Sequence, residues 1–341
     1  MGQEAFVAYS GGEAEEATRM RNPFQLLDDD PDVHDIPLRP WLNKDQDDLY
    51  VPVDSTETAY REFTGYFTDP AHLKNSGTLL LVTGNEGCGK SSLLHRCAKF
   101  LRDHCAAATP SQVSIVDLNG SAILRQDLEG QALPYEIAAR QVYLEVVSRL
   151  ADEGMLDSTD LDTLEGLDNA TLGYKRLSRR LRERDRMAVI MPPPIHADAE
   201  IRQHCLYARN RHLAFMLEST RTVLGYDFHT HVDHDSTKAM QLRVKELKEG
   251  DHWAFVENRL ARLVRRARDC SFPGIDEHTV RVIVQAEGNF DTIRQLQTGF
   301  SEVFTRAASK SVHEITSEYF MKYFWEQRGM DMRRKRRVNH T

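Results

Sequence analysis

The sequence lacks an apolar run long enough to cross a lipid bilayer, and its N-terminus has no basic segment followed by an apolar one. Its five cysteines are an odd number without paired spacing, so they do not predict a disulfide framework. We interpret them as reduced, mostly buried thiols of a cytoplasmic protein that does not associate with membranes.

An overall excess of positive charge is also lacking. The formal net charge of -8 over 341 residues argues against a protein wrapped wholesale around nucleic acid. The charge is uneven, however, because residues 28–32 are rich in aspartate and Arg333 to Arg337 form an unbroken basic run. The basic run is interpreted as a solvated tail, and the alternative is contact with the phosphates of nucleic acid.

Short apolar segments alternate with helical patterns through the first 250 residues. The predicted strands are Thr78–Thr83, Val113–Leu118, Met187–Met191, Leu213–Leu217 and Met240–Val244. The predicted helices between and around them are 54–67, 90–102, 135–153, 172–184 and 199–209, with Asp54 as a candidate cap of the first. This alternation predicts an α/β fold, with a parallel sheet flanked by helices on both faces.

Strand candidates end at Asp251, and only helical stripes follow. The domain organisation predicted from this change is a flexible acidic N-terminal arm (1–50), an α/β domain (51–248), a small all-helical lid domain (249–328) and a basic C-terminal tail (329–341).

One motif carries specific chemistry. Residues 84–91 read Gly-Asn-Glu-Gly-Cys-Gly-Lys-Ser, which matches G-x-x-x-x-G-K-[ST] in full between a buried strand and a helix. Glycines let backbone N–H groups curl around phosphate oxygens, and the positive end of the following helix faces the same anion. Lys90 supplies a charge to the terminal phosphates, and the Ser91 hydroxyl is a ligand for Mg²⁺. The motif predicts MgATP as cofactor, held by Gly84, Asn85, Glu86, Gly87, Cys88, Gly89, Lys90, Ser91 and the adjoining Ser92.

An ATPase also needs an acid at the end of a neighbouring strand to hold Mg²⁺ and polarise the attacking water. The third predicted strand ends in Met191 and three prolines, without an acid. Glu218, at the end of the fourth strand, is therefore the first candidate for the catalytic acid, and Asp117 is the second. The alternative for Glu218 is a solvated strand end without a catalytic role.

Together, the phosphate-binding loop, the strand that ends in Glu218 and the helical tail resemble AAA+ or STAND-type P-loop ATPases over roughly residues 52 to 326. The resemblance implies that Ser219 or Thr220 senses the γ-phosphate. It also implies a lid arginine after the turn that begins at Gly288, for which Arg294 is the candidate. It further implies a homo-oligomer in which an arginine such as Arg209 or Arg211 reaches the γ-phosphate of a neighbour.

Two functions fit these features. The first is an ATPase with slow hydrolysis that couples nucleotide state to assembly or to remodelling of a protein client, which the sequence does not identify. The second is a nucleotide-gated binding module with little or no turnover, for which DNA, contacted through the basic tail, is one candidate ligand. Glu218 favours the first, and the prolines after Met191 favour the second. A small-molecule kinase is a weaker option, because the helical domain follows the sheet instead of interrupting it.

The histidine-rich stretch around His229, His231 and Asp233 has two interpretations. In an extended conformation these side chains would share one face and form a metal site, whereas a polar surface loop accounts for the same composition.

Overall fold

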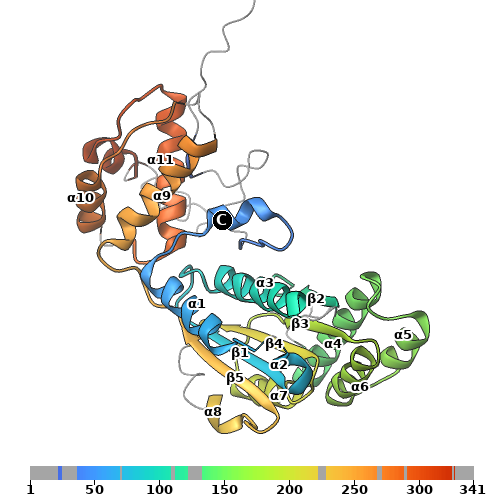
Figure 1. Ribbon diagram of the computed structural model, residues 1–341. Coiled ribbons are helices and arrows are strands. Elements are labelled where there is room, and N and C mark those ends of the chain that lie inside the picture. The colour runs from blue at the N-terminus through green and yellow to red at the C-terminus, as the bar shows by residue number, and fades with distance from the viewer. Residues whose placement is uncertain are drawn as a thin grey trace, which may run out of the picture.

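The computed structural model describes residues 22–24, 37–69, 71–108, 112–121, 133–221, 228–266, 271–287, 290–324 and 326. The central element is a parallel sheet of five strands in the order β2-β3-β4-β1-β5 (Figure 1). The strands are β1 (Gly77–Thr83), β2 (Gln112–Asp117), β3 (Arg186–Met191), β4 (Leu213–Ser219) and β5 (Thr237–Arg243). The predicted α/β class and parallel sheet are confirmed, and β5 begins three residues before the predicted start.

The strands are apolar on both sides because helices cover both faces of the sheet (Figure 1). One face packs on α1 (Asp54–Tyr66) and α3 (Lys90–Ala108), around a core that includes Leu80, Val82 and Met216. The other face packs on α4 (Tyr135–Asp152), α5 (Ser158–Glu165), α6 (Ala170–Glu183) and α7 (Asp198–Tyr207). Two single-turn helices, α2 (His72–Asn75) and α8 (Phe228–His231), complete this domain.

A separate helical unit follows the sheet, as predicted. It contains α9 (Asp251–Arg266), α10 (Glu277–Glu287) and α11 (Ile293–Ser309), packed around a core rich in phenylalanine. Phe24, from the N-terminal region, is fully buried in that core, and the Asn22 side chain donates a hydrogen bond of 2.8 Å to the carbonyl of Ser301.

Residues 37–53, here called the N-terminal strap, lie against α3 and lead into α1 through the short helix η2 (Lys44–Leu49). The Tyr50 hydroxyl donates to the carbonyl of Ser92 at 2.8 Å, and Trp41 stacks edge-on against His95 at 4.6 Å between ring centroids. The Leu49 carbonyl of the strap also accepts a hydrogen bond of 2.8 Å from Arg259 of α9, so the strap contacts both α3 and the helical unit.

Two local predictions are wrong. Asp54 is the first residue of α1 and does not cap it, because the capping position falls on Val53. The second concerns residues 157–169, a polar stretch in which the sequence predicted no helix: it contains α5, which begins with a reciprocal capping box between Asp157 and Asp160. Among the described residues, no helix is long and apolar enough to cross a membrane.

Candidate nucleotide-binding site

The predicted phosphate-binding loop, residues 84–91, joins β1 to α3 at the carboxyl edge of the sheet. Gly84, Gly87 and Gly89 have φ values of 155°, 79° and 91°, a region that residues with a side chain rarely adopt. A Cβ atom at Gly84 would lie 2.3 Å from the carbonyl oxygen of Val244. The loop backbone is thus free of side chains where it would wrap an anion, and the first N–H groups of α3 have no acceptor within their own helix. This cradle fits the phosphates of a nucleotide.

Glu218 reaches this loop from the neighbouring strand β4. The pairing of β1 with β4 sets Val82 opposite Glu218, and the side chain of Glu218 points toward α3. The Ser91 hydroxyl donates a hydrogen bond of 2.6 Å to Oε2 of Glu218. The structure therefore brings together the hydroxyl predicted to bind Mg²⁺ and the first candidate acid.

Lys90 is nearly fully buried and lies between two parts of the site. Its ammonium group donates a hydrogen bond of 2.8 Å to the carbonyl of Asn85 and lies 3.8 Å from Oε1 of Glu218. Glu218 is only 8% exposed, so this charge pair is shielded from solvent. A hydroxyl, a carboxylate and a lysine ammonium thus converge beside the glycine cradle, and this donor set fits Mg²⁺ together with phosphate.

Asn119 is a site residue that the sequence did not reveal. Its amide donates 2.9 Å to Oε2 of Glu218, the oxygen that also accepts from Ser91. The side-chain oxygen of Asn119 is buried and has no hydrogen-bond partner among the described residues. Because β3 lies between β2 and β4 in the sheet, Asn119, which follows β2, reaches Glu218 across the end of β3.

Asp117, the second candidate acid, is held by other groups. Its Oδ2 lies 2.8 Å from Nε of Arg39 and 3.4 Å from Nε2 of His95, and its Oδ1 accepts from the backbone N–H of Asn119 at 3.0 Å. Burial acts to raise the pKa of Asp117, but the hydrogen bond with His95 and the nearby charges hold it below its ordinary value. Asp117 therefore links the N-terminal strap, through Arg39, to α3, through His95. Within the described part of the chain, its charged contacts are with these two residues and not with the predicted phosphate-binding loop.

The lid domain closes on the other side of the loop. The backbone N–H of Arg294, at the start of α11, donates 3.1 Å to the carbonyl of Gly87, and its guanidinium lies 2.7 Å from Oε1 of Glu86. Asn85 donates 2.6 Å to Oε1 of Glu246, which precedes the lid. The predicted lid arginine thus lies directly at the phosphate-binding loop.

Ser219 has a different environment. It is fully buried, its hydroxyl donates 2.9 Å to the carbonyl of Ile195, and its oxygen accepts from the N–H of Arg221 at 3.1 Å. These bonds fix the end of β4 to the segment that follows the prolines.

Arg209 and Arg211 lie before β4, at the opposite end of the sheet from the phosphate-binding loop.

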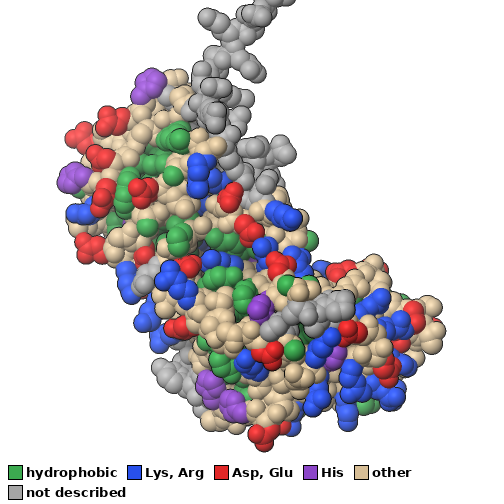
Figure 2. Space-filling model, viewed as in Figure 1, with side chains coloured by type: hydrophobic (Ala, Val, Ile, Leu, Met, Phe, Trp, Pro, Cys, Tyr) green, Lys and Arg blue, Asp and Glu red, His purple; other side chains and the backbone are tan. Residues whose placement is uncertain are grey.

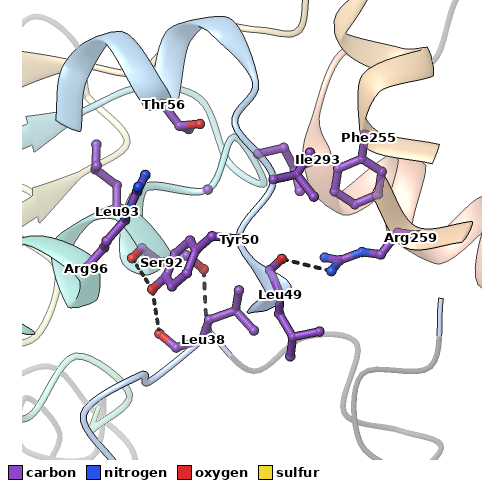
Figure 3. Close-up of a pocket in the computed structure, with 12 residues that line it drawn as sticks. Leu38, Leu49, Tyr50, Thr56, Ser92, Leu93, Arg96, Phe255, Arg259 and Ile293 are labelled. Carbon is purple, nitrogen blue, oxygen red and sulfur yellow. Dashed lines mark hydrogen bonds between the residues drawn. The ribbon is translucent and has the colours of Figure 1, made fainter. Parts of the chain in front are cut away.

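A small cavity of about 60 Å³ continues from the loop between the strap and the lid (Figure 3). Its walls include Gly89 and Ser92 from the loop region, Tyr50 from the strap, and Phe255 and Ile293 from the lid. The Arg259 guanidinium donates 2.8 Å to the carbonyl of Leu49 at one end of the cavity. Burial, together with the charge of Arg262, lowers the pKa of Arg259 to about 9.

The other residues that the sequence singled out lie away from this site or outside the described residues. His229 and His231 lie in the helical turn α8, so the extended arrangement considered for a metal site is wrong, and the described residues hold no cluster that could bind a metal ion. Four cysteines, at positions 88, 97, 105 and 205, are buried and form no disulfide within the described residues. The turn at Gly288 and Asn289 and the basic tail from residue 329 lie outside the described residues.

No protein-family model and no curated protein matches the sequence. Solved structures do match. The Aeropyrum pernix ORC1 protein, solved in complex with DNA, superposes with a TM-score of 0.53 at 16% sequence identity, covering 84% of this chain and 69% of that chain. The ADP form of the Aeropyrum pernix ORC2 protein gives a TM-score of 0.52 at 12% identity, covering 81% of this chain and 70% of that chain. The glycine cradle, the sheet order and the helical lid agree with this likeness, and the chain has the fold of the AAA+ ATPases.

Proposed function

We propose that the chain binds MgATP at residues 84–92 and uses the bound nucleotide to control its assembly or its hold on a protein client, with slow hydrolysis. The observation that carries the proposal is the hydrogen bond of 2.6 Å between Ser91 and Glu218 beside the buried ammonium of Lys90. In P-loop ATPases a serine or threonine of the loop and an acid on a neighbouring strand hold Mg²⁺ together, and this pair fits that requirement.

Each part of the site has a distinct role in this proposal. The glycine cradle and the N-terminus of α3 bind phosphate oxygens, and Lys90 neutralises their charge. The apolar and aromatic side chains around Tyr50, Thr56 and Ile293 line a cavity that opens from the loop, and this cavity of about 60 Å³ would have to widen to take the base. Mg²⁺, when bound, would supply charge stabilisation at the phosphates.

The same contacts explain why hydrolysis would be slow. Glu218 accepts hydrogen bonds from both Ser91 and Asn119 on one oxygen, which orients it toward the metal-binding hydroxyl. Asp117 is bound by Arg39 and His95, so it is not available to polarise water. The strand β3, which lies between β2 and β4, ends at Met191 and is followed by three prolines, so it supplies no acid. Among the described groups, Glu218 therefore has to combine metal binding with activation of water.

The resemblance to AAA+ proteins supports a further part of the proposal, that bound ATP promotes self-association. Arg294 and Glu86 already link the lid to the loop at 2.7 Å, so a nucleotide that displaces this contact would change the position of the lid. Such a change alters the surfaces offered to a second copy or to a client.

A binding module without turnover is the second candidate, and the prolines after Met191 favour it. The experiment that tests the proposal is calorimetric titration with ATP, with and without Mg²⁺, on the parent protein and Ser91→Ala. We expect Mg²⁺ to strengthen ATP binding by the parent and to have much less effect on Ser91→Ala. Mg²⁺-independent binding by both proteins would contradict the role of the Ser91–Glu218 pair. Measurement of released phosphate in the same samples separates the two candidates.

A further inference from the structure

A groove of about 420 Å³ lies at the end of the sheet opposite the nucleotide site. One wall is the exposed face of α6, and the other is the turn before β4. Six cations line it, all exposed: Lys175, Arg176, Arg179, Arg182, Arg209 and Arg211. Figure 2 shows Lys and Arg side chains gathered over this part of the molecule, although the whole chain carries a net charge of -8. This groove, here called the basic groove, is thus positively charged although the chain as a whole is negatively charged.

The sequence builds the groove by dividing α6 into two faces. Tyr174, Leu177 and Leu181 are buried against the sheet, and the cations recur at the intervening positions. Lys175 and Arg182 are seven residues apart, or about 10 Å along the helix axis. Lys175 and Arg176 lie four and three residues before Arg179, so these like charges are neighbours on the helix and repel one another.

The second wall is held rigidly against the first. The Ser178 hydroxyl of α6 donates 2.7 Å to the carbonyl of Arg211. The next residue, His212, has a φ of 65°, its N–H donates 2.7 Å to the carbonyl of Leu73, and its ring N–H donates 2.9 Å to the carbonyl of Arg186. The cations of the two walls are therefore placed by the fold, and little ordering is needed when an anion binds.

Most of this charge is not neutralised within the protein. Arg179 pairs with Glu183 at 2.8 Å, and Arg209 lies 3.7 Å from Asp233 at the margin of the groove. In the described part of the chain, Lys175, Arg176, Arg182 and Arg211 form no ion pair.

We propose that the basic groove binds the phosphate backbone of a nucleic-acid duplex. Five of its six cations are arginines, whose planar guanidinium groups match phosphate oxygens in pairs. The groove is concave, which suits a ridge of phosphates better than the flat surface of a bilayer. Among the described residues, no aromatic side chain lines it, so base stacking does not contribute and the contact is independent of sequence. An axial length of about 10 Å corresponds to about three phosphates of one strand.

The test is fluorescence anisotropy on a labelled duplex, with the full chain and a series of salt concentrations. The groove variant is Arg176→Ala with Arg182→Ala. The control is Arg61→Ala with Lys310→Ala, two exposed cations outside the groove that give the same change in net charge. Each lost phosphate contact removes about 0.9 from the slope of log affinity against log salt. We therefore expect the groove variant to lose about 1.8 of slope and on the order of 10–100-fold in affinity at 0.1 M salt.

Thermal denaturation of both variants shows whether they fold as the parent does. Lys90→Ala, measured by anisotropy without nucleotide, should bind the duplex as the parent does, which separates this site from the proposed ATP site. Equal affinities of the groove variant and the control variant would overturn the proposal. Polyglutamate that competes with the duplex at equal charge concentration would assign the groove to an acidic protein instead. Binding to anionic vesicles with no binding to the duplex would assign it to a membrane surface. Each of these results contradicts duplex recognition.

Discussion

The hydroxyl of Ser91 and the carboxylate of Glu218 are joined by a hydrogen bond of 2.6 Å, although 127 positions separate the two residues in the chain. The contact forms because β1 and β4 are parallel neighbours and both end at the phosphate-binding edge of the sheet. It connects the loop proposed to bind phosphate with the acid proposed to activate the attacking water.

Glu218→Gln should lower ATP turnover while nucleotide binding is largely retained. The amide keeps the shape of the side chain but cannot act as a base, and positioned acids and bases contribute about 10²–10⁴-fold to rates. Phosphate release under saturating MgATP measures the effect. Glu246→Gln is the matched control and should leave turnover unchanged, because Glu246 is also an acid bonded to the loop, at 2.6 Å from Asn85, whereas Ser91 donates to Glu218. Equal turnover by the parent and Glu218→Gln would remove Glu218 from the mechanism.

Asn119→Ala should change turnover more than affinity. The substitution deletes the donor that holds Oε2 of Glu218 at 2.9 Å, so the carboxylate can rotate. We expect a decrease of about tenfold in the maximal rate, the equivalent of about 1.4 kcal/mol, with MgATP affinity within a factor of about two. Steady-state kinetics and calorimetry on the same preparation separate the two quantities. A loss of affinity as large as the loss of rate would show that Asn119 supports binding and not the orientation of Glu218.

The stability of the protein should fall below pH 6.5 partly because of His212. Burial lowers the pKa of His212 below its ordinary value of 6.5, against the opposing effect of its bond to the Arg186 carbonyl. Below pH 6.5 the unfolded chain therefore binds more protons than the folded one, and this contribution to stability is lost as the pH falls toward the lowered pKa.

His212→Asn tests this point, because asparagine tolerates the φ of 65° at this position and does not titrate. Urea unfolding at about pH 7.5 and about pH 5.5 should show a smaller loss of stability in the variant than in the parent. Equal losses in the two proteins would mean that other groups account for the whole pH dependence.

The sequence predicted the parts of the site that are local. The spacing of Gly84, Lys90 and Ser91 predicts a phosphate-binding loop by itself, and the apolar run before it predicts β1. Glu218 at the end of β4 is the acid that the sequence proposes, but its contact with Ser91 depends on strand order, which no local pattern encodes. Asn119 was missed for the same reason, since it contacts Glu218 across the end of β3.

Two other features depend on tertiary contacts. The N-terminal strap has no period in its sequence, and contacts such as the bond from Tyr50 to the Ser92 carbonyl hold it in place. The helix α5 is short and polar, yet the pair Asp157 and Asp160 that caps it is visible in the sequence as a capping box and could have revealed its start.

ATP should promote self-association if nucleotide controls assembly in this chain as proposed. Light scattering of the parent protein at micromolar concentrations, with a non-hydrolysable ATP analogue and Mg²⁺, should report a mass above that of the monomer. An arginine supplied in trans raises phosphoryl-transfer rates by about 10³–10⁵, so turnover per subunit should also rise with protein concentration. A monomer with and without the analogue, and a constant specific activity, would contradict assembly through the nucleotide.

The affinity of the chain for MgATP with and without Lys90 tests the central claim most directly. Lys90 is buried beside the phosphate cradle, and Lys90→Ala removes a charge-assisted contact worth about 1.5–3 kcal/mol, or roughly ten- to a hundredfold in affinity. Calorimetric titration should show that loss for Lys90→Ala and parental affinity for Lys310→Ala, which removes an exposed lysine at the end of α11. Equal MgATP affinity in the parent and Lys90→Ala, or no binding by the parent, would contradict the account.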